Sequence, residues 1–386
     1  MATWNLRASR STLFLTAALL STTTLAIAAT PEHAPERGTG YDRPPQYVLD
    51  ILHAPAPPRP ILSPTRASTL LVSWVQYPPI SQVAEPFLKL AGVRVEPRTR
   101  RKHDTPGGYG VAPCAQTLSV VDVATSRETP IALPPGGCAD GFSWAADGMS
   151  FAFRNTAHDA VELWAGDRSG RTHRVGDVKL NPMLGSALQW LPDGKTLLVK
   201  LVPEDVGAPP AAEAGTEGPR IQESTGGGEF STYEARDTLR NQADAALFEY
   251  YGMSQLAFID VASGAVTAVG APAVLSDVEL SPDDQRILVT SIRKPYPYSV
   301  TYGRFAHDVE VWDRSGKATT LSQSPVAENV PIHGVPTGPR DYNWRPTEPA
   351  TLVWAEALDG GDWNAKVPAR DKVLMQSAPF TSDPVE

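Results

Sequence analysis

The sequence predicts an all-β protein of repeated four-stranded antiparallel sheets, because two short motifs recur along it. The first motif is an apolar strand that often ends in Trp, a tight turn, and a second apolar strand. In its clearest copy, 189–199, Pro192 presets φ for the turn, and Asp193 and Gly194 tolerate positive φ. Further copies, some of them weaker, lie at 63–72, 144–153, 280–289 and 344–354.

The second motif is a strand that runs to an Asp, a small polar turn, and another strand. Its copies lie at 118–126, 161–170, 256–264 and 309–316. Two hairpins per unit make a four-stranded antiparallel sheet, and repetition of such a unit is typical of a β-propeller. The predicted fold class is therefore a β-propeller with about five blades.

We expect the propeller to occupy 61–386, after a leader segment at 29–60. The five units are predicted at about 61–133, 141–178, 184–269, 274–322 and 340–380. The first and third units carry insertions at about 76–113 and 203–250. Acids and helix formers followed by an apolar run predict a helix within 232–251, and a shorter helical turn is expected at 47–52.

Residues 1–28 have the pattern of a secretory signal peptide. Arg7 and Arg10 precede an apolar stretch, and Ala-Ile-Ala at 26–28 fits a cleavage site. The alternative is a membrane anchor, but the apolar run is short and is interrupted by Ser and Thr at 21–24. We therefore expect export to the periplasm or the medium, with no membrane attachment after the signal is removed.

The chain has two cysteines, Cys114 and Cys138. Each lies twelve residues from Ser126, the centre of a predicted hairpin turn. Equal distances from a turn place two residues opposite each other on paired strands. In an oxidising compartment this favours a disulfide, and the alternative is two buried thiols with an equally structural role.

The bulk composition excludes some function classes. With 41% hydrophobic and 20% charged residues the chain is globular, and its net charge of −9 argues against a broad basic face for nucleic acid. No His-Glu-x-x-His, phosphate loop or dinucleotide fingerprint occurs, so no cofactor is expected. Gly-x-Ser-x-Gly is absent too, and the nearest strings, 141–145 and 148–152, lie in predicted strands, so no catalytic residue is assigned.

A metal site is not expected either. His307, Asp308 and Glu310 resemble ligands, but a similar His-Asp-Glu set occurs at the same blade position around His158. Alternate residues of a strand point to opposite faces, so this recurrence predicts a structural role.

A basic and aromatic cluster lies between the two hairpins of the fourth unit. Its candidate substrate-binding residues are Arg293, Lys294, Tyr302 and Arg304. One interpretation is a lining that attracts an acidic peptide segment. The alternative is a solvated loop whose tyrosines pack on a neighbouring element.

Several stretches resemble the glutamyl endopeptidase branch of the prolyl oligopeptidase family of serine peptidases. They are 47–55 with 77–80, 246–256, 304–312 and 349–361, and the resemblance spans about 45–386. It implies an N-terminal propeller of seven or eight blades and a C-terminal α/β-hydrolase domain that holds the Ser-Asp-His triad. Only about five units are counted here, so we expect an incomplete ring. No position matches the triad, so we expect the chain to be inactive alone.

The resulting hypothesis is a propeller portion that filters peptides by size and positions them for a separate catalytic domain. The expected partners are a peptide in the propeller channel, the missing catalytic domain, and a second copy bound through open blade edges. One alternative is a stand-alone five-bladed propeller that binds a ligand or protein. Another is a glycosidase-like propeller with two carboxylates facing each other in its channel.

Overall fold

The computed structural model describes residues 43–105, 110–211, 235–330 and 333–386, in units that divide between Ala54 and Pro55. The described part of the first unit contains helix α1 (Gln46–Leu52), which has no buried residue. Pro45 is its N-cap residue, with φ of −54° and an extended ψ of 149°. The short helix predicted at 47–52 is therefore confirmed. Within the described part of the chain, no helix has both the length and the apolar character needed to cross a membrane.

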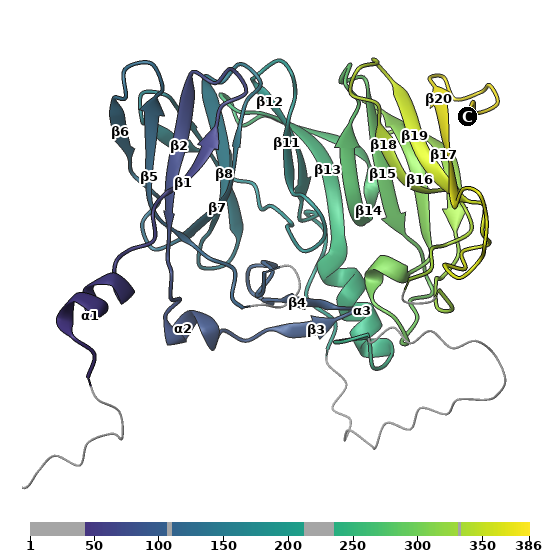
Figure 1. Ribbon diagram of the computed structural model, residues 1–386, viewed down its shortest axis with the longest axis horizontal. Helices are drawn as coiled ribbons and strands as arrows, with labels where there is room; N and C mark the ends of the chain where they lie inside the picture. The colour runs from purple at the N-terminus through teal and green to yellow at the C-terminus, as the bar shows by residue number, and fades with distance from the viewer. Residues whose placement is uncertain (1–42, 106–109, 212–234, 331–332) are drawn as a thin grey trace, which may run out of the picture. The chain divides into compact units, whose positions relative to one another are not determined.

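The second unit contains five successive antiparallel blades, which we number 1 to 5, and blades 3 and 4 share one strand (Figure 1). Blade 1 is β1 (Arg59–Leu62), β2 (Ser68–Trp74), β5 (Ala115–Asp122) and β6 (Glu128–Ile131). Blade 2 is β7 (Cys138–Trp144), β8 (Ser150–Thr156), β9 (Val161–Asp167) and β10 (Thr172–Arg174). Blade 3 is β11 (Leu188–Trp190), β12 (Thr196–Leu201), β13 (Met253–Asp260) and the first half of β14 (Val266–Leu280). Blade 4 is the second half of β14, then β15 (Arg286–Ile292), β16 (His307–Asp313) and β17 (Ala318–Ser324), and blade 5 is β18 (Arg340–Trp344), β19 (Thr351–Ala357) and β20 (Asp371–Ser377).

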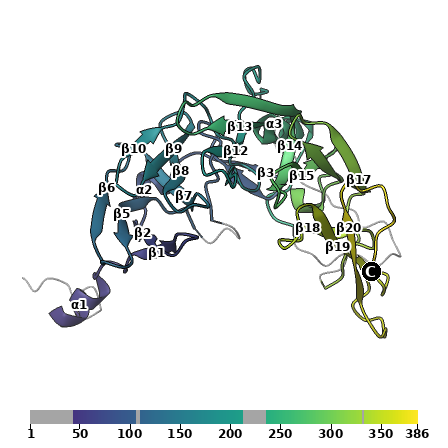
Figure 2. The same cartoon turned by 90° about the horizontal axis from the view of Figure 1, so that it is seen from above.

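Consecutive blades pack face to face through shared apolar cores. Leu70 of blade 1 and Phe153 of blade 2 belong to one core, and Leu163 of blade 2 and Val199 of blade 3 belong to the next. Blades 3 and 4 share a third core, and blades 4 and 5 share another. Figure 2 shows the sheets following one another along a curve, with β1, β7 and β18 on the inside and β6, β10 and β17 on the outside. This is the packing of a β-propeller, so the predicted fold class is confirmed.

Blades 3 and 4 are joined without a loop. β14 pairs with β13 as far as Val274, and from Leu275 onward it pairs with β15. The two sheets are therefore continuous through this one strand. The sequence predicted two separate units here, the third closing at about 269 and the fourth beginning at about 274.

Blade 1 and blade 5, the first and last of the five blades, are not joined to each other in the described part of the chain. Among the described residues, no strand pairing and no shared core joins blade 1 to blade 5, and blade 5 has three strands. A strand exchanged between the first and last blades, which would favour a stand-alone five-bladed propeller, is not found in this part of the chain. Self-association through the open edges stays a prediction, and light scattering on the purified chain measures it.

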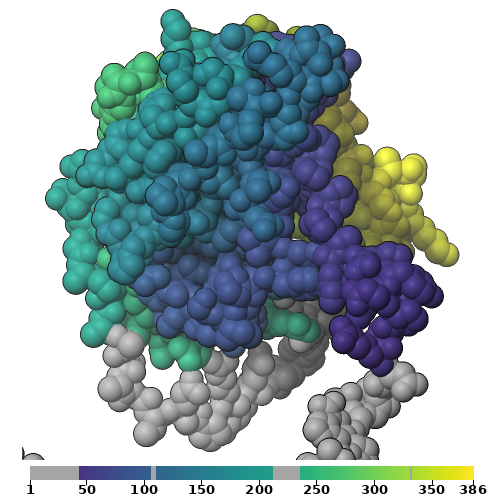
Figure 3. All heavy atoms as spheres, turned by 90° about the vertical axis from the view of Figure 1, so that its left-hand side faces the viewer, coloured from purple at the N-terminus to yellow at the C-terminus, as the bar shows by residue number. Residues whose placement is uncertain are grey.

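The insertions lie together at one end of the blades, which we call the insertion face (Figure 1). The first forms α2 (Ile80–Val83) and the hairpin β3 (Leu88–Leu90) and β4 (Val93–Val95), and the second forms α3 (Gln242–Gly252). The helix predicted in 232–251 is confirmed, and it begins at Gln242 because the side chain of Asn241 accepts a hydrogen bond from Asp244 N at 2.8 Å. Figure 3 shows the first insertion, in indigo, below the blue and teal surface of blades 1 and 2. The opposite end carries the tight turns of both motifs, and we call it the turn face.

Cys114 and Cys138 form the predicted disulfide, with their Cα atoms 4.9 Å apart. The predicted geometry was wrong, however. Cys114 directly precedes β5, but Cys138 begins β7 of the next blade, because β6 ends at Ile131 and the chain then crosses over. The disulfide therefore links blade 1 to blade 2 and does not span one hairpin.

Candidate functional site

The basic residues predicted to bind substrate lie on the insertion face between β15 and β16. Arg293 forms an ion pair with Asp308 at 2.9 Å, and Lys294 forms one with Glu249 of α3 at 2.6 Å. Arg304, in the 3₁₀ turn η1 (Tyr302–Arg304), donates to the main-chain carbonyl of Val330 at 2.9 Å. These side chains have structural partners in this structure, and their substrate-binding role stays a prediction.

The aromatic residues of the same cluster pack inward. Tyr296 and Phe305 join the core around Phe248 of α3, and Tyr302 packs against it. The rings of Tyr296 and Phe248 meet edge to face with centroids 5.2 Å apart, and burial raises the pKa of Tyr296. The packing of tyrosines on a neighbouring element, which the sequence offered as the alternative, is therefore present.

A second group of cations lines a cavity of about 350 Å³ on the same face, which we call the cationic cavity. Its walls come from the first insertion, from the ends of blade 1 and blade 2 strands, and from the connection into blade 3. The lining residues are Trp74, Arg101, Lys102, Asp104, Thr105, Ala112, Pro113, Asp140, Arg154, Thr156, Val161, Pro182 and Gly185. The packing of the first insertion against blade 2 therefore creates the cavity.

Arg101 is the most deeply buried cation in this lining, at 6% exposed. Its Nη2 donates to Ala112 O at 2.9 Å, whereas Asp140 Oδ2 is 3.9 Å away. Arg154 Nε holds the other oxygen of Asp140 at 2.8 Å. Arg101 Nε is buried and has no hydrogen-bond partner among the described residues. An unpaired buried donor costs about 1–3 kcal/mol, so a ligand oxygen in the cavity would be favourable here.

Lys102 adds a positive charge that no acid neutralises. Among the described residues, no carboxylate lies within ion-pair distance of its ammonium, and burial followed by the charge of Arg154 lowers the pKa of Lys102. Asp104, the nearest acid along the chain, is held by Arg94 at 2.7 Å. The cavity lining therefore holds three cations and two carboxylates, and both carboxylates already pair with arginines.

Lys200 of β12 lies just behind the cavity wall and is 1% exposed. Its Nζ donates to Leu184 O and, at 3.4 Å, to Leu275 O. The pKa of Lys200 is lowered to about 7, mainly by burial and secondarily by the positive charge of Lys102. Gly185 separates Lys200 from the cavity. It has a φ of +51°, and a larger residue would not fit because its Cβ would lie 2.3 Å from Ser276 O.

The arrangement suits recognition of an anion, because buried guanidinium and ammonium donors converge where acceptors are scarce. Within the described residues, no group of three or more His, Cys, Asp or Glu side chains is placed to hold a metal ion. The cavity was not predicted from the sequence, although the basic run at 98–103 was a visible signal. Only Arg101 and Lys102 of that run line it, since Arg100 donates instead to Tyr250 O at 2.7 Å.

Comparison with known proteins gives close relatives over much of the chain, although no family model matches. A probable chloroplastic glutamyl endopeptidase of Oryza sativa subsp. japonica is 34% identical over 356 residues, which is 88% of this chain and 37% of the relative. A probable chloroplastic glutamyl endopeptidase of Arabidopsis thaliana is 35% identical over 355 residues, or 88% of this chain and 36% of the relative. The chain thus spans little more than a third of these relatives.

Fold and sequence together define a β-propeller portion of a peptidase-family protein. The expected resemblance to the glutamyl endopeptidase branch is confirmed, because the chain is similar to glutamyl endopeptidase-like proteins at 34–35% identity. Among solved structures, Pyrococcus horikoshii acylaminoacyl peptidase has a TM-score of 0.42 at 10% identity, with 85% of this chain and 39% of that chain covered. The β-propeller domain of the Trilobed protease from Pyrococcus furiosus has a TM-score of 0.40 at 10% identity, with 84% and 69% covered. The fold itself rests on the strand pairing described above.

Proposed function

We propose that this chain is the substrate-selecting propeller portion of an exported serine peptidase, and that its cationic cavity binds the acidic side chain of a peptide. The observation that carries the proposal is the pairing of a buried, unpartnered donor on Arg101 with an unneutralised ammonium on Lys102. The glutamyl endopeptidase relatives support an acidic substrate, as their names specify glutamyl residues.

The cavity would bind acidic side chains more tightly than neutral ones. A bound carboxylate pairs with the cations of the cavity, whereas a bound amide leaves them unpaired. A carboxylate accepts charge-assisted hydrogen bonds from Arg101 and Lys102, whereas a glutamine side chain offers one neutral oxygen. A site built around buried donors rejects the ligand that cannot pair them. In this proposal the propeller admits short or flexible peptides, orients them by the acid, and leaves hydrolysis to a separate α/β-hydrolase domain.

Calorimetric titration of the purified chain tests the proposal. A short peptide with one central Glu should bind, and the same peptide with Gln should bind at least tenfold more weakly. Lys102→Gln should abolish this preference, Lys102→Arg should retain it, and Lys366→Gln, at an exposed lysine outside the cavity, should leave it unchanged. Equal binding of both peptides by the unmodified chain would overturn the assignment.

Hydrolysis is measured on the same peptides. We expect no turnover by the purified chain, because the proposal places the nucleophile in another domain. Export is tested separately by expressing the sequence from Met1 and sequencing the N-terminus of the secreted or periplasmic product. Cleavage after Ala28 supports the signal peptide, and an intact cytoplasmic product contradicts it.

A further inference from the structure

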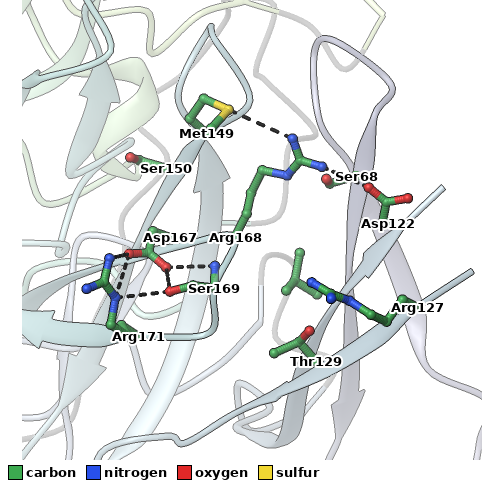
Figure 4. Close-up of a pocket in the computed structure, with 11 residues that line it drawn as sticks. Ser68, Asp122, Arg127, Thr129, Met149, Ser150, Asp167, Arg168, Ser169 and Arg171 are labelled. Carbon is green, nitrogen blue, oxygen red and sulfur yellow. Dashed lines mark hydrogen bonds and ion pairs between the residues drawn. The ribbon is translucent and has the colours of Figure 1, made fainter. Parts of the chain in front are cut away.

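A second cavity of about 500 Å³ lies on the turn face, between blades 1 and 2 (Figure 4). It is at the opposite end of the sheets from the cationic cavity, and the two share no lining residue. Blade 1 contributes Ser68, Arg127 and Thr129, and blade 2 contributes Ser150 and Arg168. The site therefore forms only where two blades meet.

The carboxylates at this cavity are occupied by their own turns. Asp122 Oδ1 accepts from the amide and the hydroxyl of Thr125 at 2.9 and 2.7 Å, and its Oδ2 meets Arg168 Nη2 at 3.0 Å. These hydrogen bonds hold the pKa of Asp122 below its usual value, so it stays ionised. Asp167 is held by Arg171 at 2.8 Å and by Ser169.

Arg127, by contrast, has an unengaged side chain. Among the described residues, its guanidinium forms no ion pair and no hydrogen bond, and Figure 4 shows it extending into the cavity beside Thr129. Arg168 reaches across from blade 2, so the two guanidinium groups lie on two sides of the same space. Three arginines line the cavity against two aspartates, and Arg127 is the one without an acid.

Ser68 supplies an independent observation. Its residue is 0% exposed, and its Oγ has no hydrogen-bond partner among the described residues. The main-chain amide of Ser68 is already satisfied by Ser63 Oγ at 3.2 Å, so the local turn does not need the Ser68 hydroxyl. A buried hydroxyl without a partner is unfavourable by about 1–3 kcal/mol, and an acceptor bound in the cavity relieves it.

We propose that this cavity between blades 1 and 2 binds a small organic oxyanion through Arg127, Arg168 and the hydroxyl of Ser68. A carboxylate or phosphate group accepts from both arginines, and the rest of the molecule lies against Val120 and Met149. The cavity volume of about 500 Å³ is suited to a small metabolite and is larger than the volume that an inorganic ion occupies. The proposal is independent of peptide binding on the insertion face.

Calorimetric titration of the full chain with citrate and with inorganic phosphate, at fixed ionic strength, tests it. We expect saturable binding of at least one probe, and the tighter one identifies the carboxylate or phosphate class. Arg127→Gln should weaken binding about tenfold or more, and Ser68→Ala several-fold, because each removes a donor to the anion. Both variants should fold, since neither side chain has a hydrogen-bond partner in the described chain.

Two controls make the test specific. Arg59→Gln changes an exposed arginine of blade 1 outside the cavity, and Lys366→Gln changes an exposed lysine that lines neither cavity. Neither should alter the affinity. The proposal is overturned if the unmodified chain binds neither probe, or if Arg59→Gln weakens binding as much as Arg127→Gln does.

Discussion

The indole nitrogen of Trp190 donates a hydrogen bond to the main-chain carbonyl of Ser143, 3.1 Å away in the first strand of the preceding blade. The same bond joins Trp144 to Ile61 at 2.8 Å and Trp344 to Glu279 at 3.1 Å. Blade 4 has Leu280 in place of Trp, and there the main-chain amide of Leu280 donates to the side chain of Gln189 at 3.0 Å. The Trp that recurs in the first motif therefore ties neighbouring blades together through their innermost strands.

Replacing Trp190 with Phe should destabilise the chain by about 1–3 kcal/mol, because the Ser143 carbonyl loses its donor at a buried interface. Phe also lacks the pyrrole ring of the indole, so the loss combines the hydrogen bond with part of the packing at this buried position. Chemical denaturation followed by circular dichroism measures the difference. Trp363→Phe, at a side chain that is 46% exposed, is the matched control and should change stability by less than about 0.5 kcal/mol. Equal effects of the two substitutions would contradict the role of the indole.

Removing the disulfide should cost about 3 kcal/mol, the entropic estimate for a closed loop between cysteines separated by 24 residues. The double variant Cys114→Ala, Cys138→Ala makes this change. Because the bond links blades 1 and 2, hydrogen exchange should rise in β5 to β8 and stay constant in β15 to β19. Reductant should destabilise the parent chain and leave the double variant unaffected. Uniform loss of protection over all blades would argue against a local link.

The elements that sequence predicted correctly are those specified by neighbouring residues. Asp193 is an example, because its carboxylate accepts from Lys195 N at 2.8 Å and Thr196 N at 2.9 Å, so the turn is built from residues within it. The continuity of β14 was not predicted, because the repeat pattern placed a unit boundary at about 269–274, where one strand pairs first with β13 and then with β15. The blade-to-blade position of the disulfide was also missed, because spacing alone does not show where the chain crosses over.

The two cavities depend on packing between distant segments, and this is why sequence reasoning did not find them. Arg101 and Arg154 share one cavity because the first insertion folds against blade 2. Arg127 and Arg168 share the other because two blades meet there. The ion pairs of the predicted cluster around Arg293 and Lys294 could not be seen from the sequence, because their partners come from β16 and α3.

Gly166→Ala should destabilise blade 2 by about 1–3 kcal/mol through overpacking. Gly166 pairs with Phe151 across β9 and β8, and a Cβ on Gly166 would lie 2.3 Å from the ring of Phe151. That ring is 0% exposed and sits in the core shared with blade 1, so it has little freedom to move. Thermal unfolding measures the change, and Gly303→Ala, where a Cβ meets nothing within 4 Å, is the control. Unchanged stability for Gly166→Ala would show that the core can yield.

Stability should rise with pH above neutrality because of Lys200. Its pKa is lowered from 10.5 to about 7 in the folded chain, whereas the unfolded chain keeps the proton up to about its ordinary value. Between these values the unfolded state binds more protons, so the free energy of unfolding increases by about 1.4 kcal/mol for each pH unit. Below pH 7 both states are protonated, and the full penalty of the buried charge remains.

Lys200→Met removes this titration and is the variant that isolates it. Urea denaturation of both proteins from pH 6 to 10 should give a difference in stability that favours the parent increasingly as pH rises. The methionine leaves the carbonyls of Leu184 and Leu275 without the Nζ donor, so a constant offset between the two proteins is expected as well. Lys102→Gln supplies the control, because removing the neighbouring positive charge should move the onset of the rise to higher pH. Parallel curves for the parent and Lys200→Met would show that Lys200 does not change its protonation between the two states.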